Sequence, residues 1–181
     1  MSQLNFQKTQ TDMPAERKKI TLMDRSRIER TVKRIAYQIA EKAKEKRICL
    51  VGLNERGLVI AGQILKGIEK ACDNEAVLIS LDVSRARQEA ERIRKEYDFE
   101  DSVLLLVDDV IFTGETMFTA LQYLLDRPSC TVYTAVLIDR GHRTLPVASE
   151  FIGMEIPTKP KEHVEMTVRE GSAEEVFLYK K

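Results

Sequence analysis

The sequence is poor in cysteine, in histidine and in long apolar runs. It has three cysteines, an odd number without a CxxC spacing, and two histidines without an HExxH motif. A disulfide scaffold and a histidine-rich metal site are therefore not expected. No apolar run approaches the ~20 residues of a membrane-spanning helix, and the polar N-terminus does not resemble a signal peptide. We expect a cytoplasmic protein without a membrane segment.

The chain also lacks an excess of charge of either sign. Its 181 residues include 29 Lys or Arg and 29 Asp or Glu, which gives a formal net charge of zero. No global field then attracts nucleic acid or an anionic membrane, so any anion must be bound at a local site. The hydrophobic share of 43% suffices for a core. We predict a mobile tail over residues 1–19 and a single domain over residues 20–181.

Hydrophobic periodicity predicts alternating helices and strands. A first helix, over residues 24–46, has one apolar face, with Ser26 or Asp24 as its N-cap. Continuous apolar runs typical of buried strands follow, separated by a turn and by helical segments; the strands are 47–53, 76–83, 103–110 and 131–139, the turn is 54–57, and the helices are 58–71, 84–101 (highly charged and solvated) and 113–126. This order predicts an α/β fold, a mainly parallel sheet flanked by helices. Three short strands after residue 150 predict antiparallel additions, a small β-rich hood.

The segment VLLLVDDVIFTGETM (103–117) has the strongest functional signal. Adjacent carboxylates, Asp108 and Asp109, follow an apolar strand, and burying them is costly unless sugar hydroxyls or a water-bridged Mg2+ interact with them. The residues Thr113 to Thr116 precede a helix, whose unpaired N–H groups form a phosphate site. The simpler interpretations are a helix cap and acids at a strand end, but the joint pattern favours a binding site.

This segment resembles the phosphoribosyl-diphosphate signature of type I phosphoribosyltransferases. The resemblance implies that Asp108 and Asp109 hold the ribose and, through water or its hydroxyls, Mg2+. It further implies substrate contacts by Val110 and a phosphate held by Thr113, Gly114, Glu115 and Thr116. The segment GLNERGLVIA (52–61) is similar to the family's pyrophosphate loop, which assigns the diphosphate to Arg56 and Gly57. It is not a Walker A loop, since Leu58 and Val59 replace the Lys and Ser/Thr.

A second stretch, LIDRGHRTLPVASEFIGMEIPT (137–158), resembles the bacterial pyrimidine-operon regulators of this family, which are also uracil phosphoribosyltransferases. The resemblance implies base recognition by Asp139 and Arg140 and by Phe151 and Ile152. Core packing is the alternative for Phe151 and Ile152. The relatives' assembly implies a homodimer or homotetramer.

The chain departs from those regulators at three places. Ala148, Met154 and Tyr37 stand where RNA-binding members carry basic or base-contacting residues, so RNA binding is not expected. The segment 84–101 is short and helical where the enzymes have a long mobile lid, which bears on turnover. Glu115 is an acidic residue where the relatives commonly have a basic residue.

These patterns together predict a phosphoribosyltransferase. The expected reaction is Mg2+-dependent transfer of the 5-phosphoribosyl group from phosphoribosyl diphosphate to a nucleobase, uracil by resemblance, with Asp109 and Arg56 as catalytic residues. The alternative is a nucleotide-sensing or RNA-binding pyrimidine regulator with little or no turnover.

Overall fold

A computed structural model describes residues 19–125 and 130–180, and the predicted N-terminal tail lies outside them except for Lys19. The elements, in chain order, are β1 (Lys19–Asp24), α1 (Arg25–Ala43), β2 (Ile48–Leu53), α2 (Asn54–Ala71), β3 (Ala76–Leu81), the 3-10 helix η1 (Val83–Arg85), α3 (Ala86–Glu96), β4 (Val103–Ile111), α4 (Glu115–Leu124), β5 (Thr131–Asp139), β6 (Phe151–Glu155), β7 (Glu162–Arg169) and β8 (Ser172–Lys180). None of the helices in these residues combines the length and the apolar character needed to cross a membrane.

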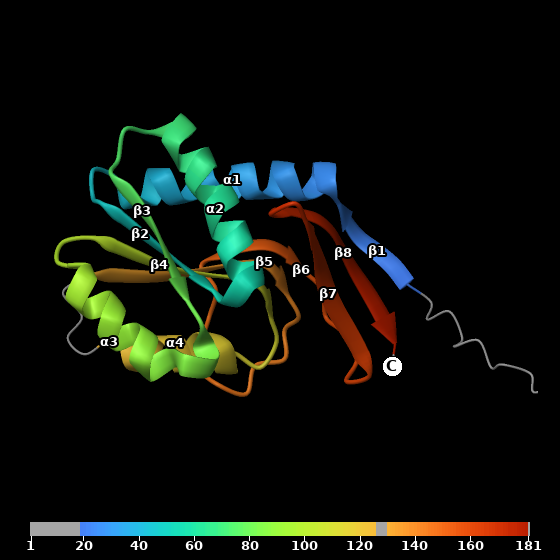
Figure 1. The fold of residues 1–181 in the computed structure, drawn as a ribbon. Helices are drawn as coiled ribbons and strands as arrows, with labels where there is room; N and C mark the ends of the chain where they lie inside the picture. The colour runs from blue at the N-terminus through green and yellow to red at the C-terminus, as the bar shows by residue number, and fades with distance from the viewer. Residues whose placement is uncertain (1–18, 126–129, 181) are drawn as a thin grey trace, which may run out of the picture.

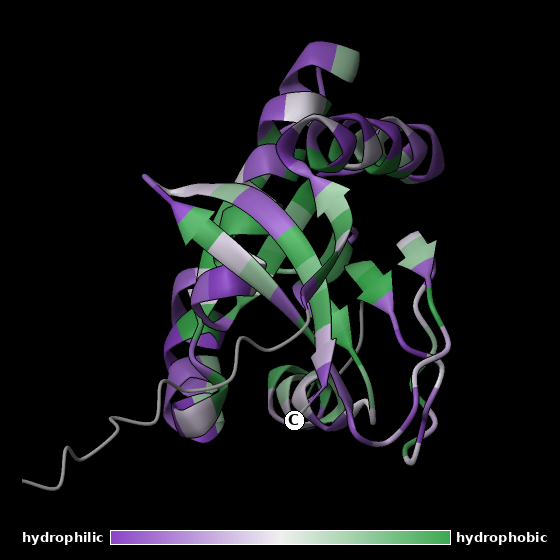
Figure 2. Ribbon diagram, turned by 90° about the vertical axis from the view of Figure 1, so that its right-hand side faces the viewer, coloured by the Kyte–Doolittle hydropathy of each residue, from purple (hydrophilic) through white to green (hydrophobic). Residues whose placement is uncertain are grey.

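Five parallel strands form the main sheet, in the order β3-β2-β4-β5-β6. Successive residues of β4 face opposite sides, because side chains alternate along a strand. Leu105 and Val107 pack in a core with α1 and α2, whereas Leu104 and Leu106 pack in a second core with α3 and α4. In Figure 2 the strands of the main sheet are mostly hydrophobic, whereas the other strands and the helices mix hydrophobic and hydrophilic residues. The predicted α/β architecture is confirmed.

A separate antiparallel sheet, β1-β8-β7, lies beside the main sheet (Figure 1) and is called the hood here. Its buried residues, among them Met23, Met166 and Val176, join the core of α1 and α2. The prediction of a β-rich hood is therefore confirmed, but its details were partly wrong. The strand β6 is a parallel member of the main sheet, and β1 had not been predicted as a strand at all.

The ends of several elements follow local chemistry. Asp24 is the N-cap of α1, since its carboxylate accepts from the Arg27 N–H at 2.7 Å, and Ser26 lies inside the helix. The predicted turn 54–57 is wrong, because these residues form the first turn of α2. The predicted solvated helix exists as α3, but its stripe of Ala86, Ala90 and Ile93 is buried in the core that α3 shares with α4.

The order of the strands positions the site. From β2 the chain passes through α2 to β3 on one side, and from β4 it passes through α4 to β5 on the other side. The connections after β2 and β4 therefore leave the sheet in opposite directions, at its carboxyl edge. Ligands of open α/β sheets bind in the crevice at such a switch point.

Candidate active site

Asp108 and Asp109 lie near the carboxyl end of β4 and are almost fully buried, with exposed fractions of 7% and 8%. The Asp109 N–H donates to Oδ1 of Asp108 at 2.9 Å. Burial raises the pKa of both carboxyl groups; the negative charge of Asp109 raises that of Asp108 further, whereas Arg56 partly offsets the effect at Asp109. The pair is thus a site of incompletely compensated negative charge, suited to hydroxyl donors or a cation.

The first turn of α2 reaches this pair because residue 57 is glycine. A Cβ at Gly57 would lie 2.5 Å from the Val107 carbonyl oxygen, closer than a side chain allows, and 3.3 Å from Oδ1 of Asp108. The helix therefore starts against β4, which places a guanidinium nitrogen of Arg56 4.0 Å from Asp109 Oδ2. The structure brings Arg56, Gly57 and the acidic pair together, as the sequence predicted.

Arg56 has a second acidic partner, which the sequence did not reveal. Its guanidinium donates to Glu165 of β7 at 2.7 Å, so one cation lies between the hood and the acidic pair. Both side chains are about two-fifths exposed, at 43% and 37%. Glu165 carried no sequence signal, because its proximity arises from the packing of the hood on α2.

The residues Thr113 to Thr116, called the phosphate turn here, follow β4 and include the first two residues of α4. Gly114 precedes the helix with φ of 90°, a conformation that favours glycine. The Glu115 N–H approaches the Thr113 hydroxyl oxygen at 3.4 Å, and the Glu115 side chain is exposed to solvent. The first N–H groups of α4 have no carbonyl partner within the helix, so this edge of the sheet offers donors to a phosphate.

The loop after β5 supports the phosphate turn. The Thr113 carbonyl accepts from the Thr144 and Leu145 N–H groups at 3.1 and 3.2 Å. Arg143 donates to Asp139 at 2.6 Å and to the carbonyl oxygens of Phe112 and Val147, both at 2.9 Å. The Asp139 carboxylate is therefore engaged in an ion pair with Arg143, and Arg143 in turn holds the phosphate turn in position.

Arg140 builds the adjacent loop. It is buried, donates to the Thr158 hydroxyl at 2.9 Å and to the Glu162 carbonyl at 2.5 Å, and lies 4.0 Å above the centre of the Phe112 ring. Burial lowers the pKa of its guanidinium. His142 also contacts the Thr158 carbonyl. Arg140 and His142 together therefore stabilise the loop before β7.

Phe151 and Ile152 lie on β6, and β5 separates this strand from the acidic pair on β4. Phe151 pairs with Ala135, the partner of Val107 in β4. Ile152 pairs with Val136, the partner of Asp108, so both residues are level with the acidic pair across the sheet. It is 5% exposed and packs edge-on against Tyr133, with ring centres 5.8 Å apart. Core packing is thus the better interpretation of Phe151. The aromatic groups at the carboxyl edge are Phe112 and His142, whose ring centres are 5.4 Å apart.

The acidic pair also fits a magnesium ion shared with a substrate. The described residues contain no group of three or more His, Cys, Asp or Glu side chains that could hold a metal alone. Mg2+ commonly uses one or two carboxylates together with water and substrate phosphates. Asp108 and Asp109 supply that number of carboxylates beside the phosphate turn.

Comparisons with known proteins agree with this geometry. Residues 21–171 match the model of the phosphoribosyl transferase domain. The chain is 37% identical over 161 residues to the bifunctional protein PyrR of Caldicellulosiruptor bescii, covering 82% of this chain and 88% of that protein. It is 32% identical over 180 residues to the bifunctional protein PyrR of Oceanobacillus iheyensis, covering 91% and 99%.

Solved structures share the fold at low sequence identity. A Leishmania tarentolae HGPRTase in complex with GMP superimposes with a TM-score of 0.72 at 16% identity, covering 93% of this chain and all of that one. The Trypanosoma cruzi hypoxanthine phosphoribosyltransferase in complex with IMP gives a TM-score of 0.64 at 16% identity, covering 80% and 79%. The chain therefore belongs to the phosphoribosyltransferase family and has the fold of its type I members.

Proposed function

We propose that the protein transfers the 5-phosphoribosyl group of phosphoribosyl diphosphate to a nucleobase, with uracil as the preferred base, and releases diphosphate. The observation that carries the proposal is the placement of Asp108 and Asp109 between Arg56 and the phosphate turn. These groups match the three parts of the donor, since the turn suits the 5-phosphate, the acids suit the ribose hydroxyls, and Arg56 suits the diphosphate. Only family membership extends this match to an activity.

The reaction breaks the bond between ribose C1 and a diphosphate oxygen and forms a bond from C1 to a base nitrogen, which loses its proton to water. Positive charge develops on the ribose, and the Asp109 carboxylate would stabilise it electrostatically. Arg56 would bind the negative charge that accumulates on the leaving diphosphate. The phosphate turn would fix the 5-phosphate and thereby orient the ribose. Mg2+, when held by Asp108 and Asp109 through water or the ribose hydroxyls, would neutralise part of the diphosphate charge.

Uracil is proposed on two grounds. The stretch 137–158 resembles that of regulators which are uracil phosphoribosyltransferases, and curated relatives at 32–37% identity carry the name bifunctional protein PyrR. Met154, Glu155 and the loop before β7 lie at the carboxyl end of β6, beside Asp139. This edge is where a base attached to the ribose would lie.

A second candidate function is nucleotide binding with little turnover. After β3 the chain enters η1 and α3 directly, with the Val83 N–H donating to Asn54 at 3.0 Å. The segment 84–101 is thus packed beside α4 through the buried stripe of α3. An enzyme that relies on a closing lid would need this segment to be free, because closure excludes water from the reacting carbon.

One experiment separates the two functions. The protein is incubated with Mg2+, phosphoribosyl diphosphate and a panel of bases including uracil, and nucleotides are detected by mass spectrometry. Uridine monophosphate as the main product supports the proposal. A rise in melting temperature with the donor but no nucleotide from any base supports the second candidate. The double variant Asp108→Asn/Asp109→Asn should lose both responses, whereas the exposed control Asp73→Asn should keep them. Persistence of the melting shift in the double variant would contradict the site.

A further inference from the structure

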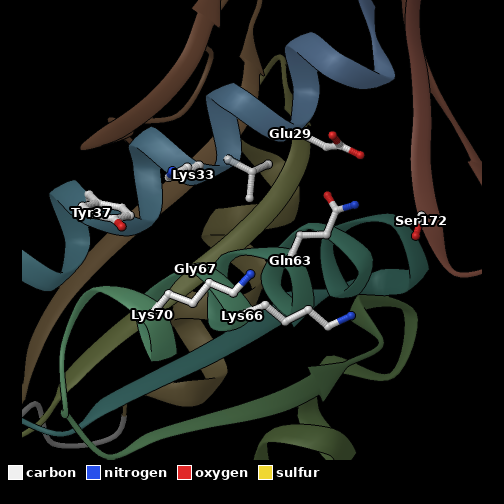
Figure 3. Close-up of a pocket in the computed structure, with 9 residues that line it drawn as sticks. Glu29, Lys33, Tyr37, Gln63, Lys66, Gly67, Lys70 and Ser172 are labelled. Carbon is white, nitrogen blue, oxygen red and sulfur yellow. The ribbon is translucent and has the colours of Figure 1, made fainter.

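A groove between α1 and α2 lies apart from the acidic pair and shares no residue with it. Its cavity measures about 420 Å³, within the usual range for small-ligand pockets. Figure 3 shows side chains of α1 facing those of α2, with Ser172 of β8 at one end; the polar and aromatic ones used below are Lys33, Tyr37, Gln63, Lys66, Lys70 and Ser172. A second hollow of about 230 Å³, also lined by Gln63, Lys66 and Ser172, continues it toward the hood.

The close crossing of the two helices creates the groove. A Cβ on Gly67 would lie 2.6 Å from the Ala36 Cβ, so the helices touch where residue 67 has no side chain. Their longer side chains diverge on either side of that contact. The space between them is therefore set by the backbone packing of α1 on α2, which is part of the main core.

The groove is positively charged in a chain of zero net charge. Lys33, Lys66 and Lys70 line it, and none of them forms an ion pair within the described part of the chain. Glu29, the single acidic residue of the lining, is paired with Arg25 at 3.2 Å. Three ammonium groups without carboxylate partners around one cavity favour an anionic ligand, and phosphate is an ion that lysine binds well.

Two further features indicate what the anion is attached to. Tyr37 is 47% exposed, and the Lys33 ammonium lies 5.8 Å from the centre of its ring. A ring in this position can stack on a planar heterocycle. In addition, the Gln63 side-chain oxygen is buried without a hydrogen-bond partner among residues 19–125 and 130–180. A buried acceptor without a donor is costly, and a ligand hydroxyl or N–H group would supply one.

We propose that the α1–α2 groove binds a free ribonucleotide, with the base on Tyr37, a ribose hydroxyl or base N–H donating to Gln63, and the phosphates on Lys66 and Lys70. A phosphorylated ribonucleotide supplies a planar ring for Tyr37, a hydrogen-bond donor for Gln63 and negative charge for the lysines. The site would be separate from the substrate site. The helix α2 joins the two, because it carries Arg56 in its first turn and Lys66 in its second half.

The test measures nucleotide binding after the substrate site has been disabled. Isothermal titration calorimetry is run with UMP, UTP, GMP and GTP on the full chain carrying Asp108→Asn/Asp109→Asn, in buffer with EDTA. Binding of at least one of these nucleotides is expected, and it should weaken at least tenfold on adding Lys66→Gln/Lys70→Gln. The matched control adds Lys44→Gln/Lys95→Gln, two exposed lysines outside the groove, which remove the same charge and should change the affinity less than twofold.

Photo-crosslinking of the wild-type chain with 8-azido-ATP or 8-azido-GTP gives a second measurement that needs no variant. Peptide mapping should find the label on the α1 peptide that contains Tyr37, and excess phosphoribosyl diphosphate should not displace it. Three results would overturn the proposal: no nucleotide binding at millimolar concentration, equal weakening by both lysine pairs, or binding of a single-stranded RNA oligonucleotide without any free nucleotide. Each of these outcomes leaves the proposed transferase function intact.

Discussion

Glu165 offers the sharpest test of how the hood acts on the candidate active site. Its carboxylate lies 2.7 Å from the Arg56 guanidinium, the group assigned to the diphosphate. A bound diphosphate must compete with Glu165 for this cation, and it also meets the negative charge of that carboxylate. Replacing Glu165 with Gln removes the charge but keeps a side chain of almost the same shape. The variant should therefore bind diphosphate more tightly.

The magnitude follows from the exposure of the pair. Since the two side chains are 43% and 37% exposed, the ion pair belongs to the class whose free energy is about 0.2–1 kcal/mol. Repulsion between the carboxylate and one diphosphate charge about 4 Å away adds at most about 1 kcal/mol in water. The total, about 0.2–2 kcal/mol, corresponds to a gain in affinity of up to about thirtyfold.

The assay is isothermal titration calorimetry of the protein with Mg2+-diphosphate, carried out at low and at high salt. The control variant is Glu174→Gln, another hood glutamate paired with an arginine, Arg25, at 3.0 Å and away from the site. Only Glu165→Gln should raise the affinity, and the gain should shrink at high salt because salt screens exposed charges. An unchanged or weaker affinity in Glu165→Gln would refute the argument that this carboxylate competes for Arg56.

Three further predictions concern the same edge of the sheet. The pKa of Asp108 is raised in the folded state, so its protonated form favours folding. This stabilisation is fully present below the unfolded pKa and is lost as the pH rises through the folded pKa, where the buried carboxylate becomes charged. Asp108→Asn should therefore raise the melting temperature at pH 7.5, by roughly 2–4 °C per kcal/mol, and this gain should fade toward pH 4. The exposed control Asp73→Asn should leave the melting temperature unchanged. A lower melting temperature in Asp108→Asn would contradict the burial argument. Gly57→Ala should cost about 1–3 kcal/mol of unfolding free energy in urea, whereas Gly62→Ala, whose Cβ would meet only the Leu78 side chain at 3.7 Å, should be neutral or stabilising; equal effects would exclude the close approach. Arg143→Gln should weaken inorganic phosphate binding about tenfold in a titration, since it frees the phosphate turn at a cost of roughly 1.5 kcal/mol per charged hydrogen bond; wild-type affinity would show that the turn holds its own shape.

Much of the fold could be predicted because its signals are local. The continuous apolar runs that became β2, β4 and β5 and the periodic face of α1 each lie within one short window of sequence. The hood was harder, since β1 pairs with β8 at the other end of the chain. Such a pairing leaves no local trace, and the six residues of β1 are too few to show a clear alternating pattern. The parallel direction of β6 likewise depends on its partner β5.

The site divides in the same way. Asp108 and Asp109 and the phosphate turn lie in one continuous segment whose geometry is set by a strand, a turn and a helix, so the sequence predicts their proximity. The burial of Phe151 could not be predicted, because its packing on Tyr133 depends on the register of β6 against β5, which the motif does not encode. Glu165 was missed because the hood reaches Arg56 only through tertiary packing.

The pairing of β1 with β8 has a consequence for synthesis of the protein. Since β8 is the central strand of its sheet and ends at Lys180, β1 leaves the ribosome about 150 residues before its neighbour exists. At typical elongation rates of about 5–20 residues per second, β1 waits roughly 8–30 seconds with an unpaired edge. The first and last residues of this strand, Lys19 and Asp24, are charged and exposed. Charges at such an edge discourage premature pairing between nascent chains. Since β7, which carries Glu165, pairs with β8, the hood reaches its final form beside Arg56 only when β8 has been made.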